Sequence, residues 1–168
     1  MSSTHPLADV GGSSFSISLR VRHPSMDPDI ITGTLGIAPE HFWGCGEPRR
    51  SASGAKLGGT HRETYWSATL PETLTQQGLV LGQLASEQST AQAQWHVEPA
   101  VFLARQVIQL KRHRVFFEQL RAEGGDASLM IELAPEAETA FRLDAAVMRQ
   151  LAELGLAVEL EIITEMTN

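Results

Sequence analysis

Three side chains between positions 41 and 61 are of types that bind metals or take part in catalysis. They are His41, Cys45 and His61, and imidazole and thiolate groups are common zinc ligands. A structural zinc site normally uses closely spaced pairs of ligands, whereas this chain contains 1 cysteine and its two candidate histidines lie far apart. We therefore expect no metal site and no cofactor.

Cys45 could also act as a nucleophile, with one of these histidines as its base. The sequence indicates no third residue that would orient such a base, and an unreactive cysteine is the commoner case. No Gly-x-Ser-x-Gly turn supports a serine nucleophile, and the glycine-rich segment 54–59 lacks the Gly-Lys-Ser/Thr ending of a phosphate-binding loop. We assign no catalytic residue, and we expect a protein that is not an enzyme.

The same region of the sequence holds arginines and aromatic side chains, which are enriched at recognition surfaces. The candidate binding residues are Trp43, Arg49, Arg50, Arg62, Tyr65 and Trp66. A purely structural alternative remains open. In that alternative the two tryptophans hold the segment on a sheet while the arginines form ion pairs with Glu47 and Glu63.

The charge of the chain bears on its partners. The formal net charge is −7, and all of the acidic excess lies after residue 70. An acidic surface repels phosphates, so we expect no nucleic-acid partner. The basic run 111–114 could contact phosphates, but its acidic surroundings favour a solvated helix turn. We expect another protein as partner, and nothing indicates a homo-oligomer.

The first residues and the cysteine content suggest a compartment. Residues 1–14 lack the basic and apolar regions of a secretory signal, and Cys45 cannot form an internal disulfide. The longest apolar runs fall well short of the roughly 20 residues that a membrane helix needs. We therefore expect a cytoplasmic protein without a membrane partner.

The hydrophobic pattern predicts both strands and helices. Alternating apolar residues predict strands near 15–22, 63–70, 129–133 and 156–162, and a short strand at 141–143. Helical spacing predicts helices over 28–35, from Pro99 to about Leu120 with a kink near 111–114, and after Asp144. Asp27 and Asp144 are expected to cap helix starts, and Gly36 and Gly155 to end helices. The segment 38–62 shows no periodicity and is expected to be a long loop.

The strands have one apolar and one polar side, which predicts helices on one face of the sheet only. The expected fold is an α+β two-layer sandwich with a mixed sheet of about four to five strands. We expect a disordered tail at 1–14, a single domain at 15–163 with an insertion at 71–96, and a tail at 164–168. Trp66 lies on the apolar side of its strand and is expected to be buried.

Charged residues predict which strands are neighbours. Arg20 and Arg22 point outward from the first strand, and Glu159 and Glu161 point outward from the last. Placing these strands side by side would create cross-strand pairs worth roughly 0.2–1 kcal/mol each. We therefore predict that the first and last strands are adjacent.

Several of these residues carry a resemblance to a known family. The matching positions are the runs 22–31 and 35–39, Trp43, Gly46, Arg62, Trp66 and the closing pattern over 143–162. They resemble the bacterial domain-of-unknown-function family 4279, over about residues 15–163. The resemblance implies the same fold class, and the family carries no established activity to transfer.

These observations favour a non-enzymatic protein-binding module, of the kind that neutralises a toxin or docks to one partner protein. The alternative is a small-molecule or anion-binding protein, or an enzyme, that uses loop 41–66. A concave pocket lined by Trp43, Arg49 and Arg62 would favour the alternative. A flat or convex loop would favour the binding module.

Overall fold

A computed structural model of the chain describes residues 15–71, 99–133 and 142–162. Its main sheet contains β1 (Phe15–His23), β2 (His41–Trp43), β5 (Thr64–Thr69), β6 (Asp126–Leu133) and β7 (Ala157–Ile162). The five strands run in the order β2-β5-β1-β6-β7. Pairing is antiparallel except between β6 and β7, which are parallel, so the sheet is mixed.

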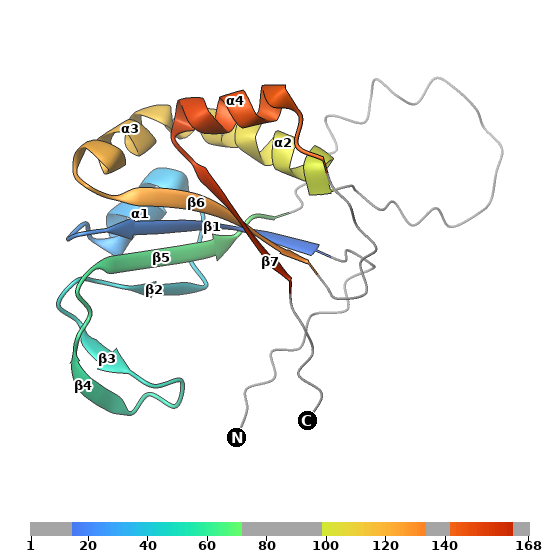
Figure 1. Cartoon of the computed structure of the whole chain (residues 1–168). Helices are drawn as coiled ribbons and strands as arrows, with labels where there is room; N and C mark the ends of the chain where they lie inside the picture. The colour runs from blue at the N-terminus through green and yellow to red at the C-terminus, as the bar shows by residue number, and fades with distance from the viewer. Residues whose placement is uncertain (1–14, 72–98, 134–141, 163–168) are drawn as a thin grey trace, which may run out of the picture.

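Helices cover one face of this sheet, as Figure 1 shows. They are α1 (Pro28–Leu35), α2 (Pro99–Leu110), α3 (Arg114–Ala122) and α4 (Ala145–Leu154), with the 3₁₀ turn η2 (Lys111–His113) between α2 and α3. All four α-helices contribute side chains to one hydrophobic core. The expected α+β two-layer sandwich is therefore confirmed, and η2 is the predicted kink.

Local residues begin and end two of these helices where the sequence predicts. The carboxylates of Asp27 and Asp144 accept backbone N–H bonds in the first turns of α1 and α4. Gly36 and Gly155 then follow these helices with left-handed φ angles of 68° and 65°. Both pairs of caps are confirmed.

The core lies between the sheet and the helices. Trp66 of β5 is fully buried there, and its indole N–H donates to Thr32 Oγ1 of α1 at 3.0 Å. Leu19 of β1 and Leu129 of β6 face the same core, because alternate residues of a strand share one side. The predicted burial of Trp66 is confirmed.

The face of the sheet opposite the helices has Arg20 near its centre. Arg20 lies between Ser67 and Ser128 on the neighbouring strands, and their short side chains leave room for its guanidinium. The guanidinium is 3.6 Å from Glu132 and, across β6, 3.8 Å from Glu159. Arg20 of β1 and Glu159 of β7 thus form an ion pair, although β6 lies between their strands.

The predicted pairing of the first and last strands is wrong. β1 is hydrogen-bonded to β5 on one side and β6 on the other, and β7 pairs with β6. The chain passes from β6 through α4 to β7, and such a crossover places β7 parallel to a nearby strand. Backbone connectivity sets this order because exposed ion pairs are too weak to do so.

Two further expectations concern the less regular parts of the chain. The segment 38–62 is not a plain loop, because it contains β2 and a separate hairpin of β3 (Pro48–Arg50) and β4 (Lys56–Thr60). Within the expected strand at 141–143, the two described residues are not in a strand. Phe141, the two tails and the expected insertion, apart from Pro71, lie outside the described residues.

Among the helices that the structure describes, none has the length and apolar character needed to cross a bilayer.

Candidate functional site

The hairpin of β3 and β4 begins at the edge of the main sheet. β2 pairs with β5 so that Trp43 lies opposite Tyr65 and Phe42 lies opposite Trp66. Trp43 is stacked on Tyr65 with ring centroids 4.5 Å apart, and it is also stacked on His61 at 4.6 Å. The interplanar angles are 19° and 20°, so the three rings form one continuous stack. This aromatic stack joins the edge of the sheet to the residue that follows β4.

Hydrogen bonds reinforce the same junction. The backbone N–H groups of Gly46 and His61 donate to the carbonyl oxygens of His61 and Glu47, both at 2.9 Å. Thr64 Oγ1 accepts from the Cys45 N–H at 3.1 Å and donates to the Met26 carbonyl at 2.6 Å. The root of the hairpin is therefore fixed to the sheet by main-chain contacts as well as by stacking.

Beyond this root the hairpin projects from the sheet, on the side away from the helices (Figure 1). All eight residues of its two strands are exposed. The tip is a short loop in which the N–H of Ser51 donates to the carbonyl of Ala55 and the Arg50 guanidinium donates to the carbonyl of Gly54. The hairpin is thus an ordered, projecting element with no core of its own.

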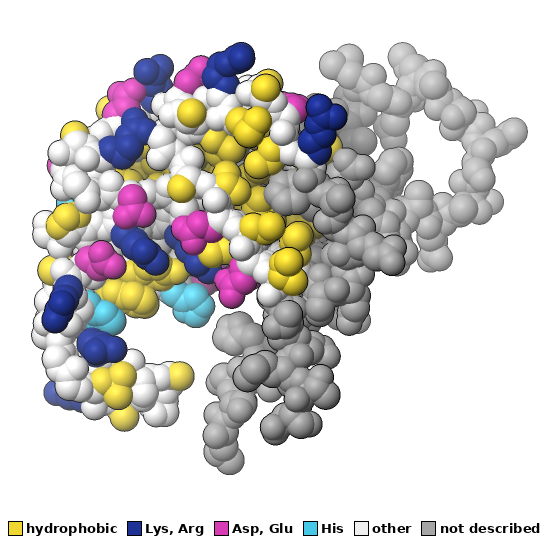
Figure 2. All heavy atoms as spheres, viewed as in Figure 1, with side chains coloured by type: hydrophobic (Ala, Val, Ile, Leu, Met, Phe, Trp, Pro, Cys, Tyr) yellow, Lys and Arg dark blue, Asp and Glu magenta, His cyan; other side chains and the backbone are white. Residues whose placement is uncertain are grey.

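The hairpin is basic. Residues 48–62 contain four Lys and Arg side chains and no Asp or Glu. These are Arg49, Arg50, Lys56 and Arg62, and each is exposed. Figure 2 shows dark-blue side chains along this projection, whereas dark-blue and magenta side chains are mixed over the sheet and helices. We call residues 48–62 the basic hairpin.

The arginines of the basic hairpin are not neutralised by neighbouring carboxylates. Within the described residues, the short contacts between basic and acidic side chains involve Arg20, His23 and Arg114, and none includes Arg49, Arg50 or Arg62. The structural alternative, in which these arginines pair with Glu47 and Glu63, is therefore not what the structure contains. Trp43 does anchor the segment, as that alternative expected of it.

The six candidate binding residues divide into three groups. Arg49, Arg50 and Arg62 are exposed on the basic hairpin. Trp43 and Tyr65 are half-buried together in the stack. Trp66 points to the other side of β5 and has no exposed surface, so it supports the sheet and does not belong to the binding surface.

The residues considered for metal binding or catalysis are also placed. His61 belongs to the aromatic stack, and Cys45 is exposed, with its Sγ donating to the Arg62 carbonyl at 3.3 Å. His41 is exposed on β2. No group of three or more metal-ligating side chains occurs in the part of the chain that the structure describes.

Lys56 and His61 belong to this site and were not predicted as binding residues. Lys56 lies across the hairpin from Arg50, and His61 completes the stack. A signal for the hairpin was present, because residues 48–62 combine cations, serines and three glycines without an acidic residue. Glycine-rich turns between short polar strands are typical of hairpins, but the strands are too short to show a periodicity.

Comparisons of this chain with family models, with curated proteins and with solved structures found no match. The resemblance to family 4279 therefore stays a hypothesis, and the site is interpreted from its own geometry.

Proposed function

We propose that the protein is a non-enzymatic binding module that recognises an acidic segment of a partner protein through the basic hairpin. The observation that carries this proposal is the set of exposed, unneutralised cations at positions 49, 50, 56 and 62 on one projecting element. Guanidinium groups bind carboxylates in two parallel hydrogen bonds, and a fixed surface places several of them at once.

The anchored root of the hairpin supports binding, because the hairpin does not have to become ordered when the partner binds. A two-stranded hairpin alone is marginally stable in water, and ordering it on binding would weaken the affinity. Here the stack of Trp43 with Tyr65 and His61 holds the hairpin before any partner arrives. The exposure of every residue of its strands also favours a protein surface over a small molecule, which usually binds in an enclosed pocket.

The charge of the whole chain supports a short acidic segment over nucleic acid. The net charge of −7 includes the basic hairpin, so the remainder of the molecule is even more acidic. A long polyanion would contact that remainder and be repelled, whereas a short peptide can contact the hairpin alone.

The proposal is tested by titrating the protein into a fluorescent glutamate-rich peptide and recording anisotropy. Reversing Arg49, Arg50 and Arg62 to Glu should weaken binding by about tenfold or more, because three favourable contacts become repulsive. The matched control reverses Arg105, Arg142 and Arg149 to Glu, which are exposed outside the hairpin and change the net charge equally.

At about 0.15 M salt, where distant exposed charges are screened, the control should bind the peptide within about twofold of the parent protein. Equal weakening in both triple variants would mean that net charge alone attracts the peptide, and the proposal would fail. It would also fail if a single-stranded DNA of the same charge bound as tightly as the peptide.

A further inference from the structure

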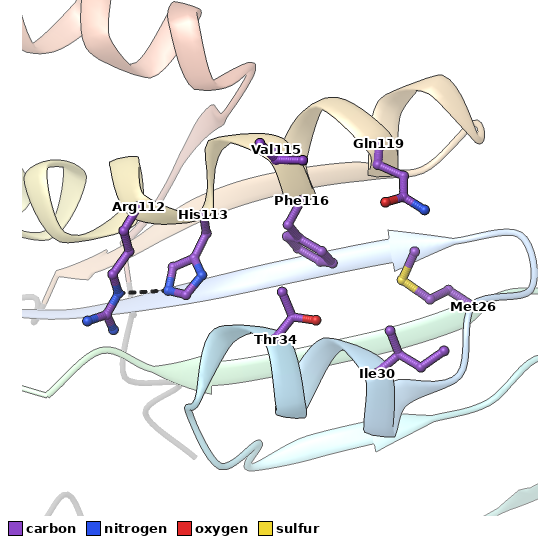
Figure 3. A pocket seen from close by; sticks show the side chains of 8 residues that line it. All are labelled: Met26, Ile30, Thr34, Arg112, His113, Val115, Phe116 and Gln119. Carbon is purple, nitrogen blue, oxygen red and sulfur yellow. Dashed lines mark hydrogen bonds between the residues drawn. The ribbon is translucent and has the colours of Figure 1, made fainter.

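A groove runs between α1 and α3 on the helical layer and shares no residue with the basic hairpin. It has a volume of about 290 Å³ and is partly open to solvent. Figure 3 shows its two walls, with Ile30 and Thr34 on α1 facing Phe116 and Gln119 on α3, and Val115, which also lines the groove, lies farther from α1. A ligand pocket for a whole small molecule usually has roughly 300–1,000 Å³ and is more enclosed, so this groove suits a few side chains.

The rims of the groove are unusually apolar for a surface. Ile30 is 56% exposed and Val115 is 75% exposed, and these two β-branched side chains stand on opposite walls. Phe116 forms a buried floor between them. Covering both rims would remove apolar surface from water, which is favourable at about 25 cal/mol per Å².

One end of the groove is cationic. Arg112 and His113 lie at the end nearest Thr34, as Figure 3 shows, and Lys111 precedes them in the η2 turn. Arg112 Nε donates to His113 Nε2 at 2.8 Å, so His113 accepts this bond as a neutral ring. Partial burial, and then the Arg112 guanidinium, lower the pKa of His113 from its ordinary value of 6.5.

The consequence is that Arg112 keeps an unneutralised charge at the mouth of an apolar groove. Its hydrogen-bond partner is an uncharged imidazole, and the ion pairs among the described residues include neither Arg112 nor Lys111. A carboxylate placed over this end would complete the contact.

The two walls of the groove also indicate which secondary structure the bound segment has. Both are helices, whose N–H and C=O groups are bonded within the helix, so they offer no ladder for an added strand. An occupant that packs there must satisfy its own backbone, as a helix does. Apolar residues one turn apart on such a helix would reach both rims.

We propose that the groove between α1 and α3 binds an amphipathic helix of a partner protein, with apolar residues between Ile30 and Val115 and carboxylates over Arg112. This second surface is independent of the basic hairpin. Charge complementarity selects an acidic helix, and the apolar rims select an amphipathic one.

The test uses a synthetic amphipathic helical peptide that has a leucine stripe and a glutamate-rich first turn. Its affinity for the full-length protein is measured by calorimetry. Val115→Glu should weaken binding by about tenfold or more, since it places a charge on an apolar rim, and Arg112→Glu should weaken it comparably. Both positions are exposed, so the fold should tolerate the changes.

Met148→Glu is the matched control, because Met148 is 51% exposed on α4 and does not line this groove. It should bind the peptide within about twofold of the parent protein. A circular dichroism spectrum of each variant confirms that helix content is unchanged.

Three outcomes would overturn the inference. The first is equal binding by the Val115→Glu and Met148→Glu variants. The second is that a peptide with serine in place of its leucines, or with lysine in place of its glutamates, binds the parent protein as tightly as the original peptide does. The third is self-association of the parent protein in sedimentation that Val115→Glu abolishes, because the groove would then bind a second copy. Reversal of the hairpin arginines should leave the Val115-dependent part of this peptide's affinity unchanged, so the two proposals can fail separately.

Discussion

Trp66 fills the space between β5 and α1, and its indole N–H donates to Thr32. Trp43 lies on β2 opposite Tyr65, which is the neighbour of Trp66 on β5. It belongs to the aromatic stack at the root of the hairpin. One step along a strand reverses the side on which a residue lies. The two tryptophans therefore have different roles, although they are close together in space.

Replacing Trp66 by Ala should lower the free energy of unfolding by about 3–5 kcal/mol, because it leaves a large cavity in a closely packed core. Urea denaturation followed by circular dichroism measures this change. Phe42→Ala is the control, since Phe42 lies opposite Trp66 on β2 but is 54% exposed. An unchanged denaturation midpoint for Trp66→Ala would contradict the core described above.

His113 should make stability depend on pH. Its pKa is lowered in the folded protein, first by partial burial and then by Arg112, so the unfolded chain binds a proton more readily. This contribution destabilises the folded state as pH falls from above 6.5 through the lowered pKa.

The His113→Gln variant should therefore lose less stability than the parent protein between about pH 8 and pH 5. Urea denaturation at a series of pH values gives the comparison. A parent protein and a variant with parallel stability profiles over this range would show that the imidazole is not held in its neutral form.

At the scale of elements, the basic hairpin depends on contacts at its root. Its strands are short, all of their residues are exposed, and their register shifts between Pro48 and Arg50. A hairpin of this kind is marginal when isolated. The stack and the hydrogen bonds at Thr64 therefore supply the order that the strands lack.

Trp43→Ala should loosen the hairpin without unfolding the core. The change removes two aromatic contacts, each worth about 0.5–1.5 kcal/mol beyond burial. Amide hydrogen exchange should become faster in β3 and β4 and stay unchanged in β1 and β6. Phe42→Ala, on the same short strand but outside the stack, should leave exchange in the hairpin as it is. Equal protection of the hairpin in both variants would show that the stack does not anchor it.

At the scale of the whole molecule, the pattern of apolar residues was sufficient to predict a sheet with helices on one face. Caps at Asp27 and Asp144 predicted where two helices begin, and alternating residues in β1 predicted its facing, because both depend on local spacing. The alternation in β7 predicted a strand, but its apolar residues Val158, Leu160 and Ile162 are exposed. Strand order was not predictable from Arg20 and Glu159, since the crossover through α4 sets it.

The sequence predicted some residues of the candidate site but not the hairpin that carries them. Residue types identified the arginines and Trp43, but the hairpin that presents them has no apolar periodicity to reveal it. The rings of His61 and Trp43 are stacked, although the two residues are distant in the sequence. The hydrogen bond from the Gly46 N–H to the His61 carbonyl helps to bring them together. The groove between α1 and α3 depends on tertiary packing, so the sequence alone gave the basic run 111–114 without its apolar neighbours.

The most direct test of the basic hairpin as the binding surface is a two-dimensional NMR titration of the ¹⁵N-labelled protein with the glutamate-rich peptide. We expect shifts in the amides of residues 48–62, in the Trp43 indole N–H and in the arginine side chains, with the Trp66 indole unaffected. Raising the salt concentration should diminish these shifts, because exposed charges are screened. Shifts centred on the helical layer, or absent from residues 48–62 while the peptide binds, would contradict the proposed function.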